Sequence, residues 1–153
     1  MLTNKKNKIV IVSGYFNPLH IGHVEMLKSA KALGGLVCVI VNNDTQQMLK
    51  KGKIIMNEKE RVEIVKALKY VDMVYLAEDD GRTVCKTLLK IAEQFSEQNY
   101  EIIFANGGDR SCSRRVPETD VCERYNIKMI FDCGGTDKLN SSSNINRLLG
   151  MEE

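Results

Sequence analysis

Short apolar runs rich in β-branched residues recur along this chain and alternate with segments of helical periodicity. Such runs, without polar alternation, are typical of strands that are buried on both faces of a sheet. Strands that alternate with helices form parallel sheets with right-handed crossovers. The sequence therefore predicts an α/β fold with a doubly wound, five-stranded parallel sheet. The expected strands span residues 9–12, 36–41, 71–76, 102–105 and 127–131.

Helices are expected between and after these strands. After His20, apolar residues recur at helical spacing up to Leu33, and a Gly-Gly pair ends that helix. Residues 83–98 carry their apolar side chains on one face, which is typical of an amphipathic helix. The other helices are expected at residues 58–70, 117–125 and 141–149.

The chain has the composition of a single globular domain, expected to span residues 1–153. Its formal net charge of +2 is too small to favour a nucleic-acid partner. No apolar run approaches the roughly 20 residues of a membrane helix, and the first apolar run lacks the cleavage pattern of a signal peptide. Five widely spaced cysteines without a C-x-x-C pair favour reduced thiols in a cytoplasmic protein over a zinc site or disulfides.

Both histidines of the chain lie in one stretch, Gly-Tyr-Phe-Asn-Pro-Leu-His-Ile-Gly-His at residues 14–23, directly after the first expected strand. An open α/β sheet binds ligands beyond the carboxyl ends of its strands. The next helix presents free N–H groups and its positive dipole end to an anion, and His20 and His23 would add two donors. The alternative is a pair of histidines that only cap or pack the helix. Tyr15 and Phe16 pack either near a ligand or in the core.

This stretch resembles the opening signature, Gly-x-Phe-x-Pro-x-His-x-Gly-His, of the cytidylyltransferase-like nucleotidyltransferase superfamily. The resemblance implies a Rossmann-like sheet with the strand order 3-2-1-4-5. It also implies that His20 and His23 contact the nucleotide phosphates and stabilise the transition state, while Gly22 lets the helix backbone approach them. Relatives acting on alcohol phosphates often carry Asp at the position of Asn17, which is expected to contact the nucleotide or the substrate. The remaining expected nucleotide contacts of this stretch are Gly14, Tyr15 and Phe16.

A second match to the family covers the charged start of an expected helix and the polar segment before that helix. Asn-Glu-Lys-Glu-Arg at residues 57–61 is similar to the family's Glu-x-Arg helix, which implies that Arg61 reaches the phosphates and acts in catalysis. A solvated arginine on a charged helix face is the alternative. The polar segment at residues 42–57 is the best candidate for a mobile loop, and it resembles a basic loop that closes over substrates. Its lysines are Lys50, Lys51 and Lys53, of which Lys50 and Lys53 are expected in catalysis and Lys50 also at the substrate.

Two further matches follow later in the chain. Asn-Ser-Ser-Ser-Asn-Ile at residues 140–145 resembles the family's closing hydroxyl motif, which holds the triphosphate, with Lys138 as a further phosphate contact. Helix capping is the alternative. Gly-Gly-Asp-Arg at residues 107–110 resembles a loop of heptose-phosphate adenylyltransferases and of glycerol-3-phosphate and ethanolamine-phosphate cytidylyltransferases, and a plain turn is the alternative. The implied nucleotide contacts are Gly108, Asp109, Ser141, Ser142 and Ser143, and the implied substrate contacts are Asp109 and Arg110.

The resemblance implies a nucleotidyltransferase that joins an NTP to a phosphorylated or phosphonate small molecule and releases pyrophosphate, with CTP slightly favoured. Mg²⁺ is implied as a cofactor held mainly by the nucleotide phosphates, and relatives are commonly homodimers. The alternatives are an ATP-using adenylyltransferase acting on a sugar phosphate and a non-catalytic nucleotide-binding module. The short chain, without a Lys-Met-Ser-Lys-Ser loop, argues against an aminoacyl-tRNA synthetase. Neither nucleic acid nor a membrane is expected as a partner.

Overall fold

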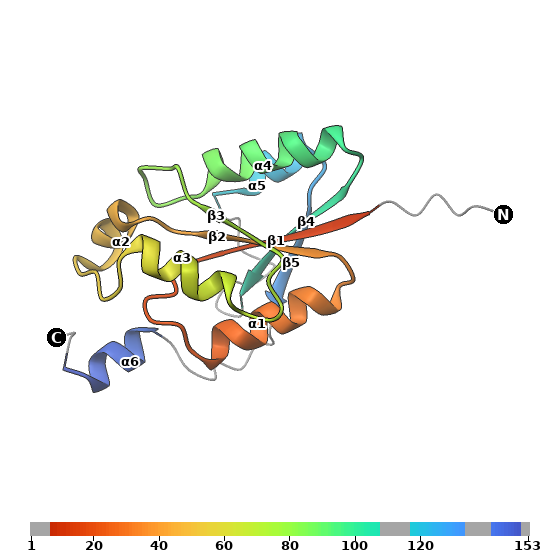
Figure 1. Cartoon of the computed structure of the whole chain (residues 1–153). Helices are drawn as coiled ribbons and strands as arrows, with labels where there is room; N and C mark the ends of the chain where they lie inside the picture. The colour runs from red at the N-terminus through yellow and green to blue at the C-terminus, as the bar shows by residue number, and fades with distance from the viewer. Residues whose placement is uncertain (1–6, 108–116, 134–141, 151–153) are drawn as a thin grey trace.

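The computed structural model describes residues 7–107, 117–133 and 142–150. Within these ranges, five parallel strands form one sheet in the order β3-β2-β1-β4-β5, with helices on both faces (Figure 1). The predicted fold class and strand order are therefore confirmed. The strands are β1 (Lys8–Gly14), β2 (Leu36–Val41), β3 (Met73–Leu76), β4 (Glu101–Gly107) and β5 (Lys128–Cys133). The helices are α1 (Ile21–Ala32), α2 (Asp44–Lys51), α3 (Glu58–Lys66), α4 (Cys85–Glu97), α5 (Thr119–Arg124) and α6 (Ser142–Leu148).

The strand β1 lies in the middle of the sheet, between β2 and β4. Ile9 is in register with Leu36 on one side and with Ile102 on the other. Ile9 and Ile11 pack in the core on one face of the sheet, whereas Val10 and Val12 pack in the core on the opposite face. All four side chains are fully buried. Because helices cover both faces, this strand has no need of polar alternation, as the sequence predicted.

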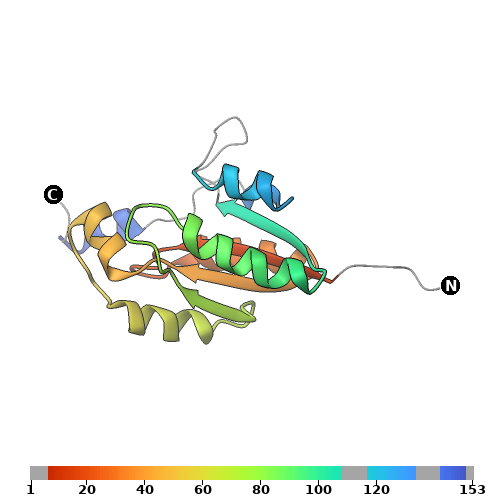
Figure 2. The same ribbon diagram turned by 90° about the horizontal axis from the view of Figure 1, so that it is seen from above.

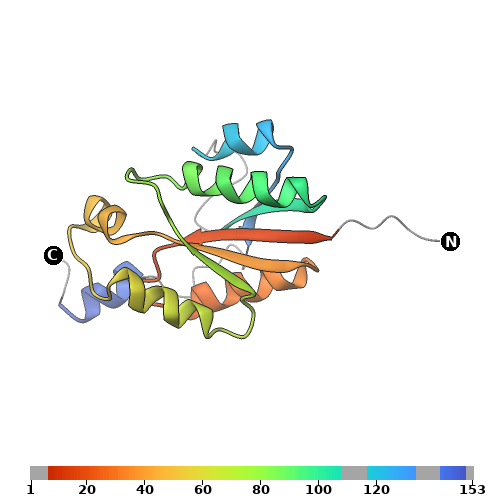
Figure 3. The same ribbon diagram turned by 45° about the horizontal axis from the view of Figure 1, so that its top comes forward.

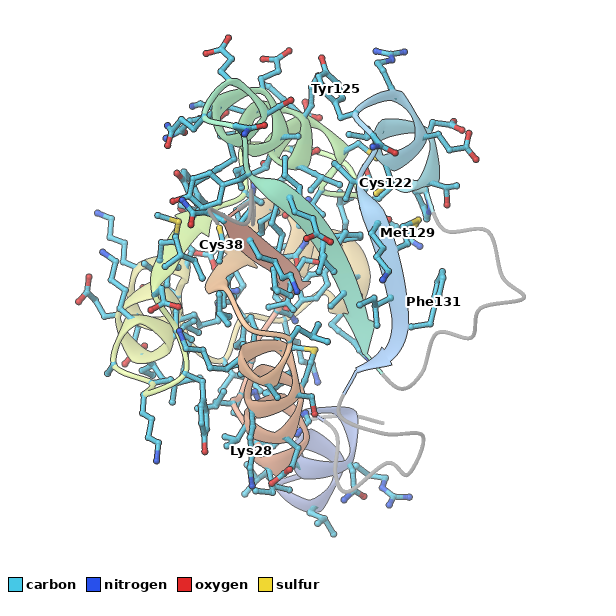
Figure 4. The ribbon with its side chains drawn as sticks, turned by 90° about the vertical axis from the view of Figure 1, so that its right-hand side faces the viewer. Lys28, Cys38, Cys122, Tyr125, Met129 and Phe131 are labelled. Atoms are coloured by element: carbon cyan, nitrogen blue, oxygen red, sulfur yellow. The ribbon has the colours of Figure 1, made fainter. Side chains whose placement is uncertain are left out.

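Two helical layers enclose the sheet. The helices α4 and α5 cover one face, and α1 and α3 cover the other, as the view from above also shows (Figure 2). Cys122 of α5 lies close to Met129 of β5 in the first layer, while Lys28 points outward from α1 on the opposite side (Figure 4). The buried side chains that these helices contribute are Leu88, Ile91, Ala92 and Phe95 of α4, Cys122 of α5, Met26, Leu27 and Ala30 of α1, and Val65 of α3.

The segment 42–57, expected as a mobile loop, contains the helix α2, so that prediction is wrong for half of its length. Asn43 caps this helix, because its Oδ1 accepts from the N–H of Gln46 at 2.9 Å and the Gln46 side chain accepts from the N–H of Asn43 at 3.1 Å. The helix ends at Gly52, which has the left-handed φ of 69° that suits glycine. The Asn-x-x-Gln pair and the closing glycine are a helix signature that the polar composition obscured.

The helix α3 ends at Lys66, before the expected end at residue 70. The turn that follows is held by Asp72, whose Oδ2 accepts from the N–H of Val37 at 2.8 Å and from Lys31 Nζ at 2.7 Å. Because of this turn, β3 begins at Met73 and not at the expected residue 71. The other predicted elements agree with the structure to within a few residues at each end. None of the helices in the described ranges combines the length and the apolarity needed to cross a membrane.

The carboxyl ends of β1 and β2 lead to the same end of the molecule. The chain leaves β1 at Gly14 and reaches the start of α1 at His20, and it leaves β2 to enter α2 (Figure 3). The helix α6, far away in sequence, also lies at this end in all three ribbon views. The arrangement gathers at one end of the sheet the segments that carry most of the predicted site residues.

Candidate functional site

The two histidines begin the helix α1, and each accepts a hydrogen bond from the backbone. His20 is the N-cap residue, and its Nδ1 accepts from the N–H of Gly22 at 3.0 Å. His23 Nδ1 accepts from the N–H of His20 at 3.3 Å. An imidazole nitrogen that accepts carries no hydrogen, so in the neutral form of each ring the hydrogen is on Nε2. Both histidines therefore cap the helix, and the same contacts orient both rings as Nε2–H donors, while their expected contact with phosphates stays a prediction.

The two imidazoles lie face to face at the start of the helix. Their ring centroids are 3.8 Å apart, with 32° between the ring planes. This proximity would make two positive charges unfavourable, which supports the neutral form that the backbone contacts favour. The result is a pair of adjacent rings, each of which carries a hydrogen on the nitrogen that does not cap the helix.

His23 is held neutral by its surroundings. The pKa of its imidazole is lowered from 6.5 to about 3, chiefly by burial and in addition by the nearby His20 and Lys50. Phe16 contributes to this burial, because its ring centroid lies 4.6 Å from that of His23 and its side chain is only 1% exposed. Of the two open interpretations of Phe16, burial in the core is the one observed. Gly14 makes room for this ring, since a β-carbon at Gly14 would stand 3.0 Å from it.

Lys50 is the loop lysine that the structure connects to the histidines. Its Nζ lies over the ring of Tyr15, 4.2 Å from the centroid, which is a cation–π contact. Its charge also acts on His23. The backbone of Lys53 lies beyond the end of α2, where its carbonyl accepts from Gln47 Nε2 at 3.1 Å. Lys50 and Lys53 are both exposed to solvent, and their catalytic roles stay predictions.

Arg61 is fully buried, so the alternative of a solvated arginine on a helix face is wrong. Its Nε donates to the Met56 carbonyl at 2.9 Å, and its Nη1 donates to the carbonyls of Tyr15 at 2.8 Å and Asn42 at 2.6 Å. Its Nη2 pairs with Asp44 Oδ1 at 2.8 Å. One guanidinium thus joins the ends of β1 and β2, the start of α2 and the segment before α3. We call these five residues the Arg61 junction.

The structure therefore assigns Arg61 a positioning role that sequence reasoning missed. Four of the five guanidinium N–H groups are used by protein acceptors. The expected contact of Arg61 with phosphates stays a prediction. No local pattern identifies Asp44 as its partner, because the two residues are 17 positions apart and meet only in the folded sheet.

Asn17 anchors the segment between α2 and α3. It is 2% exposed, and its Oδ1 accepts from the N–H groups of Ile55 at 3.2 Å and Met56 at 2.9 Å. Met56 in turn belongs to the Arg61 junction, so the two anchors act on the same backbone. The expected role of Asn17 at a ligand is compatible with this contact, because among the described residues only the Oδ1 end of the amide has a partner.

The helix α2 is also fixed to the segment that follows β3, a connection that sequence reasoning missed. Asn43 Nδ2 donates to two carbonyls there, at 2.9 and 2.7 Å, and Gln46 Nε2 donates to two others, at 2.8 Å each. The helix that carries Lys50 therefore has a defined place beside the end of the sheet. The four acceptors are the carbonyl oxygens of Ala77, Asp79, Gly81 and Thr83.

Several predicted contacts lie outside the described residues. These are Gly108, Asp109, Arg110, Lys138 and Ser141. Ser142 and Ser143 begin α6, which confirms a helix that starts in the serine run, but the structure does not describe their side chains. The position of α6 at the same end of the molecule as α1 and α2 is compatible with the predicted site (Figure 1).

A magnesium ion is implied by the resemblance and would need oxygen ligands. Among residues 7–107, 117–133 and 142–150, no group of three or more His, Cys, Asp or Glu side chains is arranged to hold a metal ion. The donors gathered at this end of the sheet are hydrogen-bond donors and a lysine ammonium, which suit anions. The expected binding of Mg²⁺ through the phosphates of a nucleotide stays a prediction.

Comparisons with known proteins agree on one family. A family model described as cytidylyltransferase-like matches residues 11–131. A FAD synthase from Thermococcus kodakarensis is 40% identical over 77 residues, which is 49% of this chain and 52% of that protein. An ethanolamine-phosphate cytidylyltransferase from Dictyostelium discoideum is 42% identical over 72 residues, which is 47% of this chain and 20% of that protein. This chain thus spans about half, or less, of the length of these two curated relatives.

A solved structure shares the fold over most of its length. The crystal structure of the lipopolysaccharide core biosynthesis protein from Thermoplasma volcanium superposes with a TM-score of 0.62 and is 27% identical. The superposition covers 82% of this chain and 95% of that one.

Proposed function

Since the chain belongs to the cytidylyltransferase-like family, we propose that it transfers a nucleoside monophosphate unit from an NTP to a phosphorylated or phosphonate small molecule. An oxygen of the acceptor's phosphoryl group attacks the α-phosphorus of the NTP, and a new P–O–P linkage forms. The bond between the α-phosphorus and the oxygen bridging to the β-phosphorus breaks, and pyrophosphate leaves. The acceptor oxygen is already anionic near neutral pH, so the reaction requires no general base.

The observation that carries this proposal is the orientation of the two histidines. Nδ1 of each ring is used by a backbone N–H, which leaves the hydrogen of the neutral ring on Nε2. In the proposed reaction these Nε2–H groups donate to oxygens of the α- and β-phosphates as negative charge grows on them. The positive end of the α1 dipole acts in the same direction.

Lys50 is the lysine that we assign to the departing pyrophosphate. It is placed beside Tyr15 and close enough to act on the pKa of His23. An ammonium group there would balance the charge of the triphosphate without a fixed geometry. Arg61 supports the same site indirectly, because its guanidinium binds the carbonyls of Tyr15 and Asn42 and so holds the ends of β1 and β2 together. The serine run at the start of α6 is proposed as a further phosphate contact.

CTP is our first choice of nucleotide, with Mg²⁺ bound through its phosphates. The name of the ethanolamine-phosphate cytidylyltransferase relative supports this choice. The name FAD synthase points instead to an adenine nucleotide, so an adenylyltransferase is the second candidate.

The test is a pyrophosphate-release assay with the four NTPs, Mg²⁺ and a panel of phosphorylated alcohols, amines and sugars. His20→Asn and His23→Ala are the informative variants, because the first keeps an acceptor at the helix start and both remove the imidazole Nε2–H. We expect each to lower turnover about 10²–10³-fold. Activity within about threefold of the wild type would remove the histidines from the mechanism.

Lys50→Met and Lys51→Met form a matched pair for the lysine assignment. The two residues are neighbours at the end of α2, and both are exposed. We expect the first substitution to lower turnover about tenfold or more, and the second to change it little. Nucleotide binding without pyrophosphate release for any acceptor would favour the non-catalytic nucleotide-binding module.

A further inference from the structure

Asn17 carries a buried amide donor that has no acceptor among the described residues. Its Oδ1 accepts from the N–H groups of Ile55 and Met56. These contacts fix the orientation of the amide, because an NH₂ group cannot accept from an N–H donor. Nδ2 therefore faces away from residues 55–56. It is buried and finds no hydrogen-bond partner in the part of the chain that the structure describes.

The surroundings of Asn17 indicate what would accept this hydrogen bond. Buried amides in folded proteins are paired as a rule, so an unpaired one at a site points to a missing ligand atom. Asn17 directly follows Phe16, whose ring contacts His23, and it precedes His20 at the positive end of α1. That end of a helix favours an anion.

The backbone on both sides of the amide is held in place. Arg61 binds the carbonyl of Tyr15, two residues before Asn17, and the carbonyl of Met56, which Asn17 itself contacts. Asn17 is buried by the surrounding protein, with 2% of its surface exposed. The amide is therefore held at a fixed position.

We infer that Asn17 Nδ2 donates a hydrogen bond to a phosphoryl oxygen of a bound substrate, and that Asn17 thereby connects this substrate to the backbone of Ile55 and Met56. The inference rests on the proposed function. An aspartate at this position would hold the same two N–H groups through one oxygen, but its second oxygen would be an anion without a hydrogen. Asn17 thus determines specificity, because its N–H favours an anionic acceptor such as a phosphoryl oxygen over an ammonium group, which can only donate.

The phosphoryl oxygen belongs either to the nucleotide or to the acceptor, and NMR spectroscopy of the wild-type protein distinguishes the two. The side-chain ¹⁵N–¹H pair of Asn17 is assigned by its disappearance in Asn17→Asp. CTP, ATP and inorganic pyrophosphate with Mg²⁺ probe the nucleotide site, and glycerol 3-phosphate and ethanolamine phosphate probe the acceptor site. A new acceptor shifts the amide proton downfield. A downfield shift with either group supports the inference and names the source.

Binding measurements on two matched variants give a second readout. Asn57 also accepts from a backbone N–H, that of Glu60 at 2.9 Å, but it is exposed at the start of α3. Asn57→Asp therefore makes the same chemical change away from the buried amide. We expect Asn17→Asp to weaken binding of the responding ligand at least about tenfold, and Asn57→Asp to change it less than about twofold.

The outcomes separate this inference from the proposed function. A ligand that binds the wild type without moving the Asn17 resonance, or that binds wild type and Asn17→Asp equally, overturns the inference alone. Absence of binding by every nucleotide overturns the proposed function and the inference with it. If Asn17→Asp fails to fold, the side-chain resonance of Asn17 is assigned in the wild type by through-bond correlation to its own backbone. The ligand titration of the wild type then decides whether the inference holds.

Discussion

Mild acid should destabilise this protein through His23. In the folded chain the pKa of this imidazole is lowered from 6.5 to about 3, chiefly by burial. Between these two values the unfolded chain binds a proton that the folded chain does not. Stability is therefore fully present above pH 6.5 and is lost as the pH falls towards 3. One such proton corresponds to about 1.4 kcal/mol per pH unit, so acidification to about pH 5 should remove about 2 kcal/mol.

The assay is urea unfolding at about pH 7, 6 and 5. Circular dichroism is the suitable probe, because the chain has no tryptophan. This window lies above the ordinary pKa values of Asp and Glu, and the chain has only two histidines. The comparison variant is His23→Gln, in which the glutamine can still accept from the N–H of His20 but does not titrate in this range.

The expected result is a fall of about 2 kcal/mol in the wild type's free energy of unfolding that His23→Gln does not share. His20 is present in both proteins, so the difference between them reports the titration of His23 together with its coupling to His20. If wild type and variant lose stability in parallel between about pH 7 and 5, His23 is not the buried neutral group described above, and the reasoning fails. A wild-type free energy of unfolding that does not change with pH in this range would also contradict the reasoning.

Three further outcomes are expected. Arg61→Met removes the cation that binds three carbonyls and Asp44, and it should lower the free energy of unfolding by about 3–5 kcal/mol in urea titrations; exposed Lys59→Met on the same helix should stay within about 0.5 kcal/mol. Gly14→Ala places a methyl group 3.0 Å from the Phe16 ring and should cost about 1–3 kcal/mol in thermal unfolding, and an unchanged melting temperature would show that the ring yields freely. His20→Asn should keep a melting temperature within a few degrees of the wild type while turnover falls about 10²–10³-fold, because asparagine also caps helices; a large loss of stability would instead mean that the imidazole is mainly structural.

The strands were predictable because their chemistry is local. Runs such as Leu36–Val41 are apolar throughout, and a sheet covered on both faces is the arrangement that buries them. The strand order came from the family resemblance, since apolar runs alone do not determine which strands are neighbours. The helix α2 was missed because its apolar residues Met48 and Leu49 are half-exposed, and its stability comes from a cap and from polar contacts with the segment after β3.

The site was only partly predictable for a different reason. His20 and His23 are three positions apart, so their meeting at one helix start follows from the sequence. The partners of Arg61 and Asn17 are up to 46 and 39 positions away, and most of these partners are backbone groups. Backbone carbonyls and N–H groups are the same in every residue, so no side-chain pattern records that they will be bound. The burial of Arg61 could be seen only once the folded chain brought these groups together.

The Arg61 junction has a consequence for protein engineering. Three of its four acceptors are main-chain oxygens, at positions 15, 42 and 56, which every amino acid possesses. Libraries that randomise positions 15 and 56 would vary the surface around the reacting groups while the scaffold beneath keeps its shape. Altered selectivity should therefore be accessible without redesign of the chain trace.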